Sequence, residues 1–150
     1  MTPEQLIELN ARVSGGRLRL WHGGAPGRRV GDLILPPNQT GAVSMAGATE
    51  ALGFSNVTSR TDRVYTTTDR EIGRAIAAYW GRRPPQQGRG WLYQVAVDEG
   101  GLELDEDIPR GPFVSFQSES ARVVSIYDAG VDPDDPKYWR KLEAFVRTLG

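Results

Sequence analysis

The chain has 150 residues, of which 39% are hydrophobic and 25% charged, and this composition is typical of one globular domain with a single core. It contains no cysteine and one histidine, which excludes thiolate zinc sites, iron–sulfur clusters, cysteine nucleophiles and His-rich metal sites. The formal net charge of −1, from 18 basic and 19 acidic residues, gives no strong field favouring nucleic acid or a membrane surface. Because the sequence shows neither a signal-peptide core nor a membrane span, we expect a cytoplasmic protein.

The first elements expected along the chain are a helix, two strands and a long loop. Pro3 is typical of a first helical position, and we expect this N-terminal helix at 1–15. The alternating stretch 17–22 predicts a half-buried strand that ends at the histidine, and 31–37 predicts a second strand closed by prolines. Residues 38–62 predict a long loop, and loops of this length in compact domains tend to be functional.

Strands and helices follow one another in the second half of the chain. Asp69 is typical of a helix N-cap, and apolar residues at helical spacing extend that helix to about Trp80. A closing helix is expected at 133–149, beginning near Pro136. The remaining clear strands are expected at 63–68, 91–97 and 121–130. We therefore expect residues 1–150 to form a single compact α+β domain, with about five to seven short strands and about three helices.

Three short stretches contain the candidate site residues: WHGG at 21–24, VYTTTD at 64–69 and GLELDED at 101–107. A histidine at a strand end, a tyrosine inside a strand and an acidic run are, taken singly, more often packing or solvated groups. A small α+β binding module without catalysis is therefore one alternative. In that interpretation the glycines form turns, Tyr65 belongs to the core and the loop 38–62 binds a peptide.

Taken in chain order, WHGG, GDLILPP, VYTTTD, AAYWG and the apolar strand before LELDED are similar to the histidine–tyrosine–acidic pattern of the ADP-ribosyltransferase fold. Within that fold they resemble the rifampin ADP-ribosyltransferase-like family, over roughly residues 18–126. The resemblance implies a split β-sheet core with flanking helices. It also implies an enzyme that cleaves the nicotinamide–ribose bond of NAD and transfers ADP-ribose to an acceptor. The acceptor would be a small molecule such as a rifamycin, or a protein, with nucleic acid less favoured.

The resemblance implies a role for each residue of the first two stretches. His22 would form a hydrogen bond with a ribose hydroxyl of NAD, and Gly23 would let the backbone approach the nicotinamide amide closely. Gly24 would belong to the same cofactor site, although the family has a threonine at this position. Tyr65 would stack on the cationic nicotinamide ring. No metal is expected.

The resemblance also implies a carboxylate near the cleaved ribose carbon, because cleavage passes through an oxocarbenium-like centre, as in glycoside hydrolysis. Aligning the apolar residue after the glycine turn selects Asp105 over its neighbours Glu103 and Glu106. Glu119, just ahead of the strand ARVVSI, is the competing candidate, and Gln117 is a weaker one.

Two other NAD-consuming activities stay open. The RNA 2′-phosphotransferase branch begins from a similar histidine–glycine strand but has a histidine where this chain has Tyr65, which argues against it. An NAD glycohydrolase would use water as the acceptor. No motif in the sequence identifies the acceptor, and we expect the residues that select it to lie in the loop 38–62 and the linker 82–90.

Overall fold

The computed structural model describes residues 3–14, 18–36, 63–82, 88–98, 101–104 and 115–147. The helices are α1 (Pro3–Ser14), α4 (Arg70–Arg82) and α5 (Pro136–Arg147). The strands are β1 (Leu20–Gly24), β2 (Leu33–Ile34), β3 (Val64–Thr67), β4 (Trp91–Ala96), β5 (Glu103–Leu104), β6 (Ser115–Ser118) and β7 (Ala121–Asp128). The expected α+β class is confirmed.

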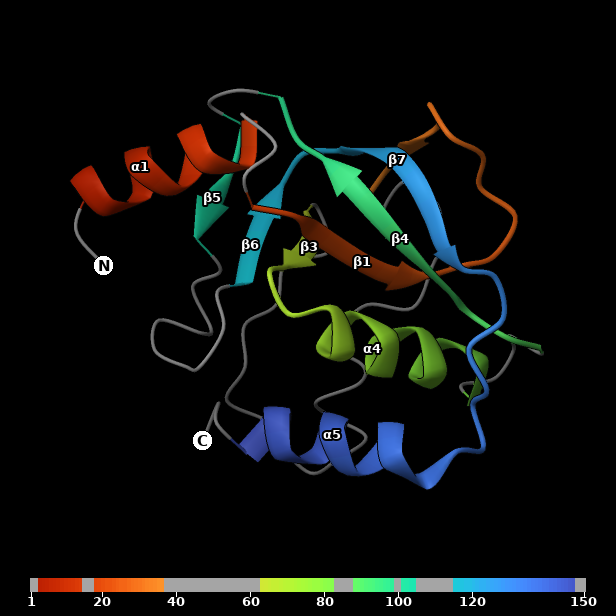
Figure 1. The fold of residues 1–150 in the computed structure, drawn as a ribbon. Helices are drawn as coiled ribbons and strands as arrows, with labels where there is room; N and C mark the ends of the chain where they lie inside the picture. The colour runs from red at the N-terminus through yellow and green to blue at the C-terminus, as the bar shows by residue number, and fades with distance from the viewer. Residues whose placement is uncertain are drawn as a thin grey trace.

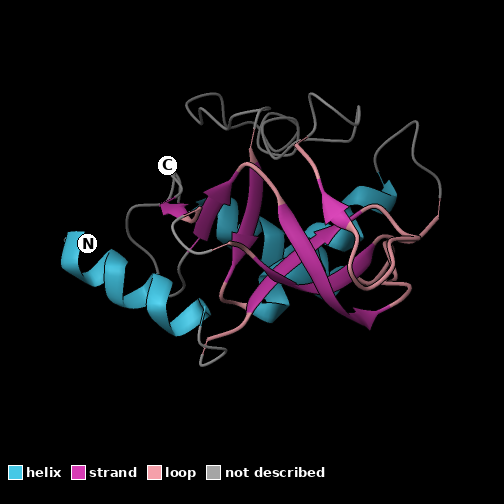
Figure 2. Cartoon of the chain, turned by 90° about the horizontal axis from the view of Figure 1, so that it is seen from above, coloured by secondary structure: helices cyan, strands magenta, loops and turns pink. Residues whose placement is uncertain are grey.

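One curled antiparallel sheet organises the described residues (Figures 1 and 2). Its strands follow one another in the order β2-β7-β4-β1-β3-β6-β5. β1 lies inside this sheet and pairs with β4 from Leu20 opposite Val95 to Gly24 opposite Trp91. On its other side β1 meets β3, which in turn pairs with β6. Segments far apart in the sequence are thus brought beside the single histidine.

Alternation along the strands divides the core between the two faces of the sheet. The larger cluster comprises Leu20, Ile34, Val64, Tyr93, Val95, Leu102, Phe116, Ala121 and Val123. The opposite face presents Trp21 and Leu92 to Ala77 and Ala78 of α4, with Val131 completing that cluster. His22 follows Trp21 and stands opposite Tyr93, so the register places it on the face of the larger cluster.

The helices α4 and α5 form two further layers below the sheet in the view of Figure 1, with α4 between the sheet and α5. The rings of Tyr79 and Trp139 stack between the two helices, with centroids 6.1 Å apart and planes inclined by 15°. On the sheet side, a Cβ at Gly23 would clash with the carbonyl oxygen of Gly73 and lie 2.6 Å from the backbone nitrogen of Ala77. Backbone therefore packs directly on backbone where α4 crosses β1.

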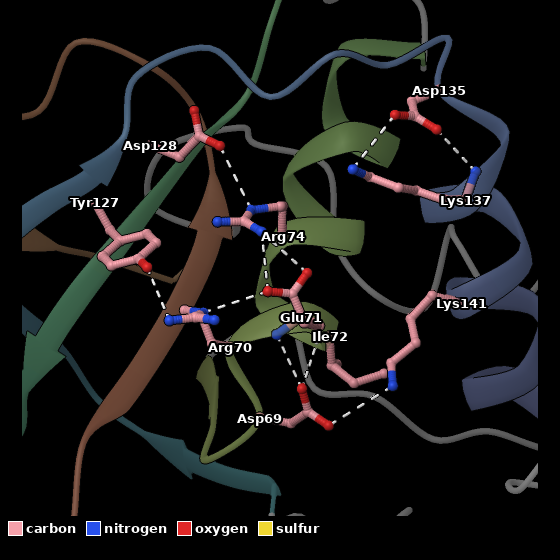
Figure 3. Close-up of polar contacts among 10 residues, drawn as sticks. All are labelled: Asp69, Arg70, Glu71, Ile72, Arg74, Tyr127, Asp128, Asp135, Lys137 and Lys141. Carbon is pink, nitrogen blue, oxygen red and sulfur yellow. Dashed lines mark hydrogen bonds and ion pairs between the residues drawn. The ribbon is translucent and has the colours of Figure 1, made fainter.

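The start of α4 is stabilised by the expected N-cap. The Asp69 Oδ1 accepts hydrogen bonds from the backbone N–H groups of Glu71 and Ile72, at 2.9 and 3.2 Å (Figure 3). The other carboxylate oxygen of Asp69 lies 3.9 Å from Nζ of Lys141 on α5. The cap prediction is confirmed, and the same residue also connects α4 to α5.

Polar and aromatic groups connect the first turns of α4 to the end of β7 (Figure 3). Arg70 donates a hydrogen bond of 2.8 Å to the Tyr127 hydroxyl, and the guanidinium of Arg74 lies 3.4 Å from the Asp128 carboxylate. Both guanidinium groups also lie over the Tyr127 ring, which contacts buried Trp21 edge-on. These groups hold α4 against the face of the sheet opposite to that of His22.

Two expected boundaries are wrong. The strand expected at 17–22 lies at Leu20–Gly24, so His22 is in the middle of the strand, because pairing with β4 extends through both glycines. The closing helix begins at Pro136, which confirms the start expected from that proline, whereas the outer bound of 133 is too early, because the side chain of Asp132 accepts from the backbone N–H of Asp134 and forms a turn first. The expected loop 38–62 lies outside the described residues.

In the part of the chain that the structure describes, no helix combines the length and the apolar character needed to cross a membrane.

Candidate functional site

The sheet separates between β1 and β3, and His22 lies at that point. Among the residues described in these two strands, a single pair, Trp21 opposite Thr67, stands in register. One residue further along β1, the His22 ring reaches across to β3, and its Nδ1 lies 2.9 Å from the carbonyl oxygen of Tyr65. The His22 side chain thus satisfies the backbone carbonyl of Tyr65 next to the point where the pairing of β1 with β3 ends.

The partner of Nδ1 determines which nitrogen of His22 carries the proton. A carbonyl oxygen can only accept, so Nδ1–H is the donor and Nε2 of the neutral ring is an acceptor. Burial lowers the pKa of His22 from 6.5 to about 4; the bond to Tyr65 opposes this shift, and the positive charge of Arg28 adds to it. At pH 7 the imidazole is therefore neutral, and Nε2 can accept a hydrogen bond from a hydroxyl group.

Gly23 and Gly24 lack side chains for two different reasons. The missing side chain of Gly23 faces α4, as described above, so helix packing accounts for this glycine. A Cβ at Gly24 would lie 2.9 Å from Nε2 of His22, closer than real Cβ contacts allow. The position where the resembling family has threonine is thus occupied here by the edge of the imidazole ring, and Gly24 makes room for it.

Tyr65 begins a row of register partners that crosses three strands. Gln117 of β6 stands opposite Tyr65, and Glu103 of β5 stands opposite Gln117. Residues directly opposite in antiparallel strands share a face, so these three side chains are neighbours. Tyr65 is half-buried and Gln117 is 2% exposed, whereas Glu103 is exposed and bonded to Nε of Arg63 at 3.2 Å. A buried amide therefore stands beside the tyrosine predicted to hold the nicotinamide ring. Because Tyr65 precedes Thr67 by two residues and Thr67 stands opposite Trp21, this row lies on the α4 face of the sheet, whereas the side chain of His22 lies on the other face.

Of the carboxylate candidates Asp105, Glu106 and Glu119, the structure describes only Glu119. Asp105 and Glu106 lie outside the described residues. Glu119 is exposed and directly follows Ser118, which is the register partner of Val64. Glu119 therefore lies beside the beginning of β3, close in register to Tyr65.

Two residues that the sequence did not single out, Tyr93 opposite His22 and Arg28 bonded to Tyr93, belong to the surroundings of the site. Tyr93 stands opposite His22, and its buried hydroxyl donates a 2.6 Å hydrogen bond to the carbonyl oxygen of Ala25. The same hydroxyl oxygen accepts a 3.3 Å hydrogen bond from the backbone N–H of Arg28. Burial raises the pKa of Tyr93, so its hydroxyl is protonated at neutral pH. Arginine is so frequent in this chain that the sequence carried no signal for Arg28.

No group of histidine, cysteine, aspartate and glutamate side chains that could hold a metal ion occurs within the described ranges. Comparison with known proteins finds no family model that matches the chain and no significant match among curated proteins.

Proposed function

We propose that this protein is an NAD-dependent ADP-ribosyltransferase, which cleaves the nicotinamide–ribose bond and transfers ADP-ribose to a small-molecule or protein acceptor. The observation that carries this proposal is the neutral His22, tied through Nδ1 to the Tyr65 carbonyl where β1 and β3 separate. When bound, NAD supplies both the ADP-ribose group and the departing nicotinamide.

His22 fits the role of a ribose-binding group. A ribose hydroxyl donates well to a neutral imidazole nitrogen, and the tautomer of His22 leaves Nε2 as such an acceptor. The hydrogen bond to Tyr65 holds the ring in one orientation, so little side-chain entropy is lost on binding. A cationic histidine would instead repel the positively charged nicotinamide ring, and the low pKa of His22 avoids this.

Tyr65 is our candidate for the nicotinamide-binding group, because an aromatic face attracts a cationic ring and the side chain is half-buried. Since Thr67 stands opposite Trp21, alternation places the Tyr65 side chain on the α4 face and that of His22 on the other face, so NAD would have to bind across the point where β1 and β3 separate. Its neighbour Gln117 offers an amide that can position either the substrate or a carboxylate. Asp105 remains our candidate for the carboxylate that stabilises positive charge at the ribose carbon, and Glu119 is its competitor.

Nicotinamide release tests the proposal directly. Purified protein is incubated with NAD, and free nicotinamide is quantified by chromatography, with and without a lysate that supplies acceptors. We expect release by the wild-type protein and transfer of labelled ADP-ribose to an acceptor. Absence of NAD binding up to millimolar concentration, measured by titration calorimetry, would contradict the proposal and favour the non-catalytic binding module.

The amide variants Asp105→Asn and Glu119→Gln separate the two carboxylate candidates, because each keeps its shape and loses its charge. A group that acts mainly in the transition state affects turnover far more than binding of NAD. We expect Asp105→Asn to lower kcat by about 100-fold or more with KM for NAD nearly unchanged, and Glu119→Gln to retain most of the rate. A normal rate in Asp105→Asn beside a collapsed rate in Glu119→Gln would reverse the assignment.

A further inference from the structure

Arg28 is bonded through its backbone to Tyr93, the residue opposite His22, and carries a side-chain nitrogen that has no partner within the described residues. Its Nε is buried and makes no hydrogen bond. The nearby carboxylate of Asp32 accepts instead from the backbone N–H of Arg29, at 2.8 Å. A buried guanidinium nitrogen without an acceptor is costly, so such a group is typical of a binding site for an anion.

The fold holds Arg28 in place through Tyr93. Because the Tyr93 hydroxyl bonds to both Ala25 and the backbone of Arg28, the segment 25–28 is folded over the face of the sheet that carries His22. The positive charge of Arg28 also contributes, after burial, to the lowered pKa of His22. Arg28 is thus positioned by the same strand pair that positions His22.

The two groups together define the ligand chemistry. Nε2 of His22 accepts a hydrogen bond from a hydroxyl group, whereas the guanidinium of Arg28 binds an oxyanion. A sugar phosphate carries a hydroxyl group and an oxyanion a few bonds apart, and a dinucleotide contains two such units. Arginine also matches the geometry of phosphate oxygens better than that of a single-atom anion.

We propose that Arg28 binds a phosphate group of the dinucleotide whose ribose hydroxyl is bound by His22, with Nε–H of Arg28 as one of the donors. This inference rests on the proposed function and adds a phosphate-binding residue to the same site.

The single histidine makes the test direct, because the imidazole resonances of His22 in an NMR spectrum have no competitor in the chain. These resonances are followed while inorganic pyrophosphate, ADP-ribose or nicotinamide riboside is added to the wild type, Arg28→Gln, Arg28→Lys and Arg29→Gln. Arg29 is the matched control, since it is the exposed neighbour of Arg28 with the same charge. Circular dichroism establishes that each variant is folded.

We expect pyrophosphate and ADP-ribose to bind Arg28→Gln about tenfold more weakly than the wild type, or weaker still, and Arg29→Gln within about twofold of it. Nicotinamide riboside lacks a phosphate and should bind the wild type and Arg28→Gln equally. Should Arg28→Gln fail to fold, Arg28→Lys serves instead, because it keeps the charge but loses Nε–H and should show a smaller loss. Equal phosphate binding by the wild type and the Arg28 variants, or an equal loss in Arg29→Gln, would overturn the inference.

The outcomes also separate this inference from the proposed function. Nicotinamide release with an unchanged KM for NAD in Arg28→Gln would remove Arg28 from the site and leave the proposed activity in place. Binding of pyrophosphate that depends on Arg28, without nicotinamide release by the wild type, would support the phosphate site and contradict the activity.

Discussion

At the scale of single residues, the chemistry of the candidate site depends on how one imidazole ring is held. The Tyr65 carbonyl selects the Nδ1–H tautomer of His22, and Gly24 leaves space for the Nε2 edge of the ring. Burial keeps the ring neutral. Each of these conditions is needed for His22 to accept a hydrogen bond from a sugar hydroxyl at physiological pH.

Replacement of His22 by asparagine isolates the function of Nε2. The asparagine amide can still donate to the Tyr65 carbonyl, but it has no atom at the position of Nε2. We expect kcat/KM for NAD to fall by roughly 10- to 100-fold, which corresponds to about 1–3 kcal/mol, while the free energy of unfolding changes by less than about 1 kcal/mol. His22→Ala, which also leaves the carbonyl without its partner, should be the less stable of the two. Unchanged nicotinamide release per folded molecule of His22→Asn would contradict the role of His22.

The lowered pKa of His22 predicts how stability depends on pH. The unfolded chain binds a proton at His22 near pH 6.5, whereas the folded protein binds it only near pH 4. Between these values the unfolded state holds more protons, so the free energy of unfolding decreases as pH falls from 6.5 to 4, by at most about 3 kcal/mol. Urea unfolding at pH 7, 5.5 and 4 measures this decrease. His22→Asn should lack this part of the pH dependence, and an identical dependence in both proteins would contradict the burial of a neutral His22.

Among the secondary-structure elements, β1 has two consecutive glycines that make room for different neighbours on its two faces. Gly23 lets α4 pack against the strand backbone, and Gly24 makes room for His22 on the other side. The helix that crosses β1, α4, is capped by Asp69, and its residues Arg70 and Arg74 hold its N-terminal end against β7. The position of the imidazole therefore depends on the packing of an element on the opposite face of the sheet.

The N-cap of α4 can be tested separately from its ion pair. Asp69→Ala removes the acceptor for the N–H groups of Glu71 and Ile72, and we expect the free energy of unfolding to fall by about 1 kcal/mol. Asp69→Asn keeps a side-chain oxygen and should lose less. Lys141→Met removes the 3.9 Å ion pair but leaves the cap, and because Lys141 is exposed its effect should be close to zero. Thermal unfolding of the three variants measures these differences, and equal losses in Asp69→Ala and Lys141→Met would contradict the cap as the dominant contribution.

At the scale of the whole molecule, the sheet, α4 and α5 form successive layers (Figure 1). α4 is covered on both sides, whereas α5 packs mainly on α4, through the stacked rings of Tyr79 and Trp139. An outer layer can separate without breaking the pairs between strands, so α5 should open at a lower free energy than the sheet.

Hydrogen exchange measures this layered stability. Amides of α5 should exchange faster than those of α4, β1 and β4 in the native protein. Trp139→Ala removes the stacked ring and should accelerate exchange in α5, with little change at β1 and β4 when compared under conditions far from global unfolding. A uniform acceleration in all elements would mean that α5 and the sheet unfold as one unit.

Local signals in the sequence were sufficient to predict where helices start and where the clearest strands lie. Pro3, Asp69 and Pro136 mark helix starts because the interactions that begin a helix involve residues within about four positions of one another. The alternation in 91–97 likewise predicted β4, because side chains of a strand take opposite faces in turn. His22 and Tyr65 could be proposed as partners by their resemblance to a known pattern, although the end of the strand at His22 was misplaced.

The sequence by itself determined the α+β class and the helix starts, because these follow from neighbouring residues and from hydrophobic periodicity. The tertiary structure alone decided which nitrogen of His22 is the acceptor, why Gly23 and Gly24 are glycines, and that Arg28 is bonded to Tyr93, the residue opposite His22. Each of these depends on groups brought together by strand pairing and helix packing, such as His22 and Tyr65, which are 43 positions apart. Contacts of that separation are specified by the whole core rather than by any local pattern, and a pattern of residue types does not reveal their geometry.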